Sequence, residues 1–139
     1  MFRVETEIEV RYAETDQMGV VYHANYLVWL EIGRTKFLEA LGLNYGEMEK
    51  MGVLAPMVEA NLKYKKPAKY GDVVTVKTGV KKTSAFKTVY VSEIRNQDGA
   101  LCIIAVCTVV TVDAKTFKLK SIKKDFPEWY QKYSEIADE

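Results

Sequence analysis

The chain has little of several residue types on which recognisable sites are often built. Its 139 residues include one histidine, two cysteines and three prolines, and the formal net charge at pH 7 is +1. No cluster of cysteine, histidine and carboxylate residues has the spacing of metal ligands, so we expect no metal. A net charge this close to zero argues against wholesale binding of nucleic acid. No window approaches the roughly 20 apolar residues of a membrane span, so we expect no transmembrane helix.

The two cysteines, Cys102 and Cys107, lie in one apolar run that we interpret as a strand. At about 3.3 Å per residue they would be about 16 Å apart, well beyond the ~7 Å limit for a disulfide. Because side chains alternate along a strand, the two thiols should also point to opposite faces. We expect free, buried cysteines that pack as small hydrophobic residues.

The composition is that of a folded protein, with 48% hydrophobic and 28% charged residues. The length predicts one domain over residues 1–139, since domains usually contain about 100–200 residues. The first ten residues are charged from position 3 onward and contain no apolar run of signal-peptide length. We therefore expect a cytoplasmic protein.

Residues 3–12 alternate between apolar and charged side chains, which predicts a half-buried strand that ends in Tyr12. Residues 25–41 change to helical spacing, with Asn25 as the expected N-cap and Gly42 just beyond the last turn. The first two turns of this helix carry few polar side chains, so we expect them to be enclosed on several sides. Gly33 costs about 1 kcal/mol relative to alanine in a helix, and close approach to a sheet would explain it.

The rest of the sequence is mostly strand. After a loop or short helical turn at residues 45–52, apolar runs separated by turn residues predict five strands, and Pro127 predicts the start of a final helix. The predicted strands are Ala55–Tyr64, Asp72–Lys82, Phe86–Asn96, Leu101–Val112 and Phe117–Ile122. The fourth is nearly all apolar, which predicts a central strand buried on both faces. This order predicts an α+β fold in which a curved antiparallel sheet wraps around one long helix.

The best candidates for catalysis lie between Arg11 and Glu31, in RYAETDQMGVVYHANYLVWLE. Asp16, a glycine turn at Gly19 and His23 come directly before a helix start, where N–H groups lack partners and carry partial positive charge. An acid beside such donors suits acyl transfer, in which one group activates water and others hold an oxyanion. We predict Asp16 as the leading catalytic residue, with His23 and Tyr12 as orienting or polarising groups.

Other interpretations of these residues stay open. Asp16 could be a turn residue that bonds its own backbone, and His23 could be a packing residue. A serine triad would also need His23, but no Gly-x-Ser-x-Gly motif is present. Lysines cluster at residues 63–69, 81–82 and 118–124, either as solvated strand edges or as a phosphate-binding rim.

The residues of the Asp16 segment resemble the 4-hydroxybenzoyl-CoA thioesterase family of hotdog-fold proteins. They are most similar to its bacterial acyl-CoA thioesterase branch associated with the tol-pal system. The matching elements are Tyr12, Glu14-Thr15-Asp16, Gly19, Val21-Tyr22-His23-Ala24-Asn25-Tyr26, Glu31 with Arg34, and Pro67 with Gly71-Asp72. The chain departs at Ala13, where an aromatic residue is common, and at Trp29, which is bulkier than usual.

The resemblance implies thioester hydrolysis without a metal or covalent cofactor, CoA being part of the acyl-CoA substrate. Asp16 would be the general base or nucleophile, and the backbone N–H near His23 would polarise the thioester carbonyl. Residues implied to contact the substrate are Gly19, Val21, Tyr22, Asn25, Tyr26, Lys65 and Lys82.

The resemblance also implies a homodimer or homotetramer, a dimer of dimers with the active site at a dimer interface. The alternatives are an acyl-carrier-protein thioesterase, hydratase chemistry on the same scaffold, and a non-catalytic acyl-CoA-binding protein.

Overall fold

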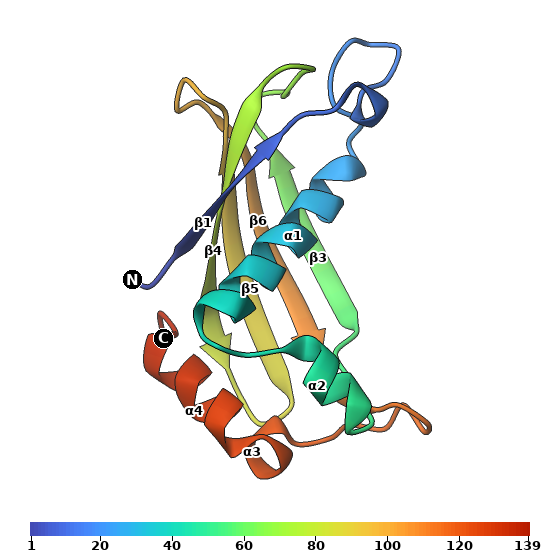
Figure 1. Cartoon of the computed structure of the whole chain (residues 1–139), viewed down its shortest axis with the longest axis vertical. Helices are drawn as coiled ribbons and strands as arrows, with labels where there is room; N and C mark the ends of the chain where they lie inside the picture. Colours follow the sequence, from blue (N-terminus) through green and yellow to red (C-terminus); the bar gives the residue numbers. More distant parts are fainter.

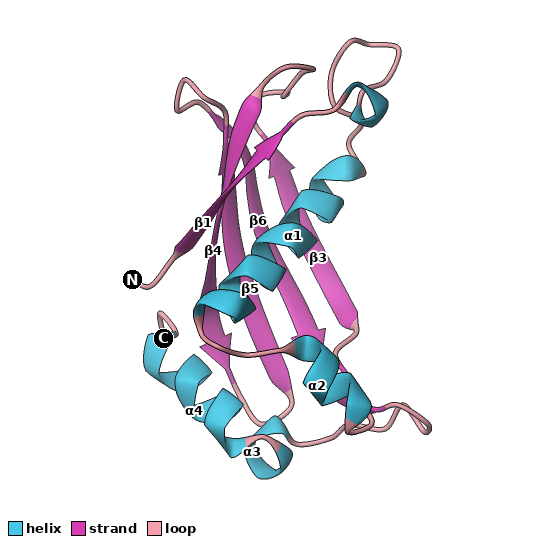
Figure 2. Cartoon of the chain, in the orientation of Figure 1, coloured by secondary structure: helices cyan, strands magenta, loops and turns pink.

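A computed structural model describes residues 1–139, and its main feature is a five-stranded antiparallel sheet crossed by one long helix (Figure 1). The strand order is β1-β4-β5-β6-β3, and β2 and β7 form a separate antiparallel pair. The strands are β1 (Val4–Glu9), β2 (Val53–Leu54), β3 (Met57–Tyr64), β4 (Val73–Thr83), β5 (Lys87–Arg95), β6 (Leu101–Val110) and β7 (Val112–Asp113). The helices are η1 (Tyr12–Glu14, a 3₁₀ turn), α1 (Asn25–Ala40), α2 (Tyr45–Lys50), α3 (Ile122–Asp125) and α4 (Pro127–Ile136). The predicted α+β hotdog architecture is confirmed (Figure 2).

Helix α1 packs on the sheet through Trp29, Leu30 and Phe37, all with no exposed surface. Gly33 faces β4 at very short range, since a Cβ atom there would lie 2.6 Å from Thr78 Oγ1 and 2.7 Å from Val76 Cγ1. The expectation that this glycine permits close helix–sheet approach is therefore confirmed.

The start of α1 differs from the expectation. Leu27 and Val28 are 40% and 46% exposed, so the prediction that this part of the helix is enclosed on several sides is wrong for the single chain. The N-cap is Ala24, and Asn25 is the first helical residue. Gly42 follows the helix with φ +72°, in the left-handed region that favours glycine.

The first strand is shorter than predicted. Glu9 pairs with Val73, the first residue of β4, so the chain has no strand partner beyond this point. Tyr12 consequently lies in η1, is 76% exposed and packs edge-on against Tyr70 with ring centroids 5.6 Å apart. The prediction that Tyr12 ends a strand is wrong.

Two predictions for the later strands are also wrong. Residues 117–122 form no strand, because Phe117 adopts φ +59° in a turn and Ser121 caps α3 by accepting a hydrogen bond from Lys124 N. Strand β6 is buried on the face that packs against α1, but Ile104 on the other face is 36% exposed.

The cysteines are free and buried as predicted. They do not point to opposite faces, because both belong to one buried cluster. A bulge, in which Ile94 pairs with Ile103 and Arg95 with Leu101, leaves Cys102 out of the ladder and shifts the alternation. Burial raises the pKa of both thiols.

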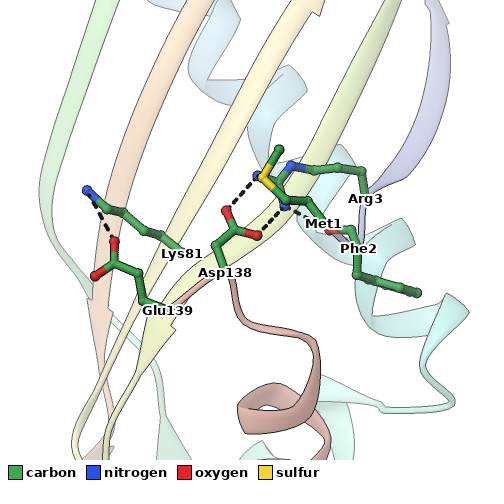
Figure 3. Close-up of polar contacts among 6 residues, drawn as sticks. All are labelled: Met1, Phe2, Arg3, Lys81, Asp138 and Glu139. Atoms are coloured by element: carbon green, nitrogen blue, oxygen red, sulfur yellow. Dashed lines mark hydrogen bonds and ion pairs between the residues drawn. The ribbon is translucent and has the colours of Figure 1, made fainter.

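The two ends of the chain meet beside β4 (Figure 3). Asp138 N and Glu139 N donate to the carbonyl oxygens of Val80 and Lys81. The Arg3 guanidinium donates to both carboxylate oxygens of Asp138, at 2.9 and 2.7 Å. This pair fastens both termini to the sheet. No helix of the chain is both long and apolar enough to cross a membrane.

Candidate active site

The loop that carries Asp16 is a tight turn closed on itself. Thr15 and Val21 form a β-bridge, Asp16 N donates to Val20 O and Gly19 N donates to Asp16 O, each at 3.0 Å. Gly19 has φ +79°, which explains the glycine at this position. Asp16 Oδ1 accepts a hydrogen bond from Met18 N at 2.8 Å, whereas Oδ2 accepts none from the chain. The turn therefore orients the carboxylate and leaves one oxygen available.

The approach to α1 supplies unpaired backbone donors. The N–H groups of His23 and Ala24 donate to no acceptor in the chain, while Asn25 N donates to Tyr22 O at 2.9 Å. The His23 carbonyl accepts a hydrogen bond from Tyr64 Oη on β3 at 3.1 Å, which holds this segment against the sheet. Free N–H groups at a helix start are suited to hold a developing negative charge.

A cleft of about 220 Å³ joins the Asp16 loop, the start of α1 and the segment that follows β3. It brings together five of the predicted site residues, namely Asp16, Val21, His23, Tyr26 and Lys65. The other residues that line it are Met18, Val20, Tyr64, Lys66 and Pro67. Tyr26 forms a buried wall, since its hydroxyl accepts from Ala68 N at 3.0 Å and burial raises its pKa.

The other predicted residues lie outside this cleft. Gly19 shapes the turn, and the Tyr22 ring packs against the His23 ring with centroids 4.5 Å apart. Asn25 Nδ2 donates to Glu14 O at 2.8 Å, so this side chain holds the preceding loop instead of capping its own helix. Tyr12 is exposed in η1. Lys82 is near the end of β4 remote from Val73, where it pairs with Val89, and the structure does not bring it to Asp16.

Sequence reasoning missed Glu14 and Trp29. Glu14 is only 5% exposed, and its carboxylate accepts from Trp29 Nε1 at 2.8 Å and from Arg11 N at 2.9 Å. Burial alone would raise the pKa of Glu14, but these hydrogen bonds and the Arg11 guanidinium outweigh it and leave the pKa below its ordinary value. The sequence contains one hint of this role, an acidic residue three positions after Arg11. The contact between Glu14 and Trp29 cannot be predicted from the sequence, because it forms only when α1 packs against the loop.

A second cavity of about 330 Å³ lies between α1, α2, α4 and the sheet. Arg34 lines it half-buried, with no ion pair or hydrogen bond in the chain, and its guanidinium carbon is 6.0 Å from the centre of the Tyr90 ring. The hydroxyls of Tyr90 and Tyr133 share a 2.7 Å hydrogen bond, and Met57 and Glu31 also line the cavity. This cavity combines apolar walls with polar hydrogen-bond donors.

The Asp16 cleft can support attack on a carbonyl. A carboxylate with a free oxygen can activate water or attack directly, and unpaired N–H groups nearby can stabilise the resulting oxyanion. The lysines at the cleft, Lys65 and Lys66, supply positive charge on its rim.

Comparison with known proteins agrees with this chemistry. Residues 10–130 match the family model described as the thioesterase-like superfamily. The chain is 52% identical over 127 residues to the putative acyl-CoA thioesterase YneP of Bacillus subtilis, covering 91% of this chain and 92% of that protein. It superposes on the structure of DHNA-CoA thioesterase from Staphylococcus aureus with a TM-score of 0.95 and 41% identity, covering 97% of this chain and 91% of the other. An acyl-acyl carrier protein thioesterase of Arabidopsis thaliana, ATL3, is 38% identical over 81 residues, which cover 58% of this chain and 43% of that protein.

Proposed function

The chain belongs to the thioesterase-like superfamily and is an enzyme with its hotdog fold, and on that basis we propose that it hydrolyses acyl-CoA thioesters with Asp16 as the catalytic carboxylate. The observation that carries the proposal is the cleft that Asp16 and His23 line together, because Asp16 has one carboxylate oxygen without a hydrogen bond and the N–H groups of His23 and its neighbour Ala24 are unpaired. The 52% identity to a relative named for acyl-CoA thioesterase activity supports CoA as the carrier. Within the superfamily, affiliation with the tol-pal-associated branch stays a prediction.

In this mechanism Asp16 acts as general base for water or as nucleophile, and a backbone N–H beside His23 polarises the thioester carbonyl. The His23 imidazole tunes the site from the wall of the cleft, whereas Tyr12, which lies outside the cleft in the single chain, stays a predicted contributor. Lys65 approaches the phosphates of CoA, since lysine binds phosphate as a point charge. Lys82 is remote from Asp16 in the single chain, so it would contact CoA only from a second subunit or at a part of the substrate other than the phosphates near Lys65. CoA is part of the substrate, and the proposed reaction uses no cofactor of the protein's own.

We further propose that the active unit is a homodimer that pairs two copies of β3, with a tetramer as a dimer of dimers. Strand β3 is at the sheet edge, and its Met57, Val58 and Tyr64 are 36%, 59% and 52% exposed. An unpaired apolar edge is a template for pairing with another strand. Antiparallel pairing would set the Met57 end of one β3 beside the Tyr64 end of the other. Because Met57 lines the second cavity and Tyr64 lines the Asp16 cleft, the second cavity of one copy would then lie beside the Asp16 cleft of the other.

This arrangement makes the second cavity the site for the acyl group. Its unpaired Arg34 and the Tyr90–Tyr133 hydroxyls favour an acyl group that carries polar oxygen on an apolar body. The structural relative from S. aureus is named for DHNA-CoA, which is therefore the first substrate to test. Activity on acyl-carrier-protein thioesters is the alternative that the ATL3 similarity favours, and non-catalytic acyl-CoA binding is a further alternative. One domain spanning residues 1–139 and a cytoplasmic location complete the proposal.

The test is thiol release from a panel of thioesters. DHNA-CoA, benzoyl-CoA, short and long aliphatic acyl-CoAs and matched acyl-carrier-protein thioesters are each incubated with the protein. We expect release of free CoA, fastest for an acyl group with polar oxygen. Release only from carrier-protein thioesters would favour the alternative, and binding without any thiol release would refute hydrolysis.

A further inference from the structure

Glu14 lies two residues before Asp16, where the chain enters the loop that carries Asp16. Its side chain is 7% exposed, and both carboxylate oxygens are occupied. Oε1 accepts from Arg11 N at 2.9 Å, and Oε2 accepts from Trp29 Nε1 at 2.8 Å and from Arg11 Nη2 at 3.3 Å. Trp29 is fully buried in the second turn of α1, so the indole N–H is a rigid anchor.

The backbone of Glu14 ties the same loop to the start of α1 a second time. Its carbonyl oxygen accepts from Tyr22 N at 2.9 Å and from Asn25 Nδ2 at 2.8 Å. Side chain and backbone together join Glu14 to Trp29 and Asn25 of α1 and to Tyr22 just before it. The Asp16 turn is the segment between Glu14 and Tyr22, so both of its ends are fastened at Glu14.

The same contacts lie next in sequence to both reactive elements of the site. Asp16 follows Glu14 by two residues, and the unpaired N–H groups of His23 and Ala24 follow Tyr22 directly. A buried charged hydrogen bond to a rigid donor is among the stronger polar contacts in proteins. The Glu14–Trp29 contact therefore anchors the residue at which both ends of the Asp16 turn are held.

We propose that Glu14, held by the Trp29 indole, is a positioning residue that aligns the Asp16 carboxylate with the His23–Ala24 backbone donors for thioester hydrolysis. This inference rests on the proposed function. Glu14 contacts neither substrate nor reacting atoms in this role, and it acts through the loop.

The experiment compares Glu14→Gln and Trp29→Phe with the wild-type protein. Glutamine keeps the size of the side chain and removes its charge. Phenylalanine keeps an aromatic ring and removes the N–H donor together with part of the indole volume, so its melting temperature is compared with that of the wild type. Misplacement of a catalytic group by about 1 Å can cost on the order of 100-fold in rate. We expect kcat for the best acyl-CoA substrate to fall about 10- to 100-fold in each variant. KM and the Kd of an unreactive thioether analogue should change by less than about threefold, because the contacts with substrate are untouched.

The double variant separates positioning from general damage. If the two residues act as one unit, Glu14→Gln with Trp29→Phe should be no slower than the slower single variant. The matched control is Glu9→Gln, an exposed acid on β1, which should keep the wild-type kcat. Thermal melting of each variant confirms folding, and Trp29→Phe keeps the test informative if Glu14→Gln does not fold.

Wild-type kcat in either folded single variant overturns the proposal, as does a loss confined to KM. These outcomes differ from failure of the proposed function, in which the wild-type protein and Glu9→Gln also release no thiol.

Discussion

The close contact at Gly33 gives the sharpest prediction for stability. An added Cβ would lie 2.6 Å from Thr78 Oγ1 and 2.7 Å from Val76 Cγ1, and both side chains are fully buried on β4. Optimal separations between carbon atoms are about 3.5–4.0 Å, so the helix or the strand would have to move by about 1 Å. Overpacking of this kind typically costs about 1–3 kcal/mol. Both obstructing side chains lie on an inner strand of the sheet that cannot move freely. We therefore expect the overpacking cost of Gly33→Ala to be near the upper end of this range, about 3 kcal/mol.

Helix propensity acts in the opposite direction. Alanine is more favourable than glycine inside a helix by about 1 kcal/mol, so we expect a net loss of about 2 kcal/mol in the free energy of unfolding. For a chain of this size that loss corresponds to a fall in Tm of roughly 5–10 °C. Urea unfolding at fixed protein concentration measures it directly, and fixed concentration matters if the protein is a dimer.

An exposed position on the same helix supplies the control. Glu39→Ala and Glu39→Gly differ only in propensity, so their difference should be about 1 kcal/mol in favour of alanine. In a Val76→Ala background, Gly33→Ala should cost less than in the wild type, since one obstructing atom is gone. If Gly33→Ala is instead as stable as the wild type or more so, the helix is not held as close to β4 as described.

Three further predictions concern the chain ends and the buried tyrosines. Asp138→Asn should lower the free energy of unfolding by about 1 kcal/mol at pH 7, because a paired surface carboxylate contributes up to about this much. The Arg3 guanidinium lowers the pKa of Asp138, so this contribution is complete above the ordinary aspartate pKa near 4 and is lost as pH falls through the lower folded value. Urea melts should therefore converge with the wild type near pH 2, and a constant difference would refute the pairing. Burial raises the pKa of Tyr90 to about 12, whereas in the unfolded chain it is about 10. The free energy of unfolding should therefore decrease as pH rises from about 10 to about 12. Tyr133→Phe removes the partner hydroxyl and should cost about 1–3 kcal/mol at pH 7, measured by urea unfolding, and an unchanged stability would contradict the buried hydrogen bond.

The outline of the fold could be predicted because periodicity depends on near neighbours in sequence. The alternation in residues 4–9, the helical spacing after Asn25 and the positive φ at Gly42 all follow from local rules. The end of β1 could not be predicted, because alternation continues to Tyr12 while the partner strand begins only at Val73. Where a strand stops depends on its neighbour, which the local pattern does not contain.

The candidate site divides in the same way. The block around Asp16 and His23 was recognisable from the sequence, and the structure brings both to one cleft. The burial of Glu14 was not, because it depends on Trp29 fifteen residues later and on the packing of α1. The resemblance implies substrate contact for Lys82, but the structure places it near the end of β4 remote from Val73. Which loop lies beside that end depends on the folded chain and not on the local pattern.

The central claim is that Asp16 provides the reacting carboxylate at a thioester. Its most direct measurement pairs single-turnover hydrolysis by Asp16→Asn with calorimetric binding of an unreactive thioether analogue of the best acyl-CoA. We predict a fall in the rate of at least about 100-fold, as for loss of a general base, with the Kd unchanged within about threefold. A folded Asp16→Asn protein that hydrolyses the substrate at nearly the wild-type rate would contradict the claim.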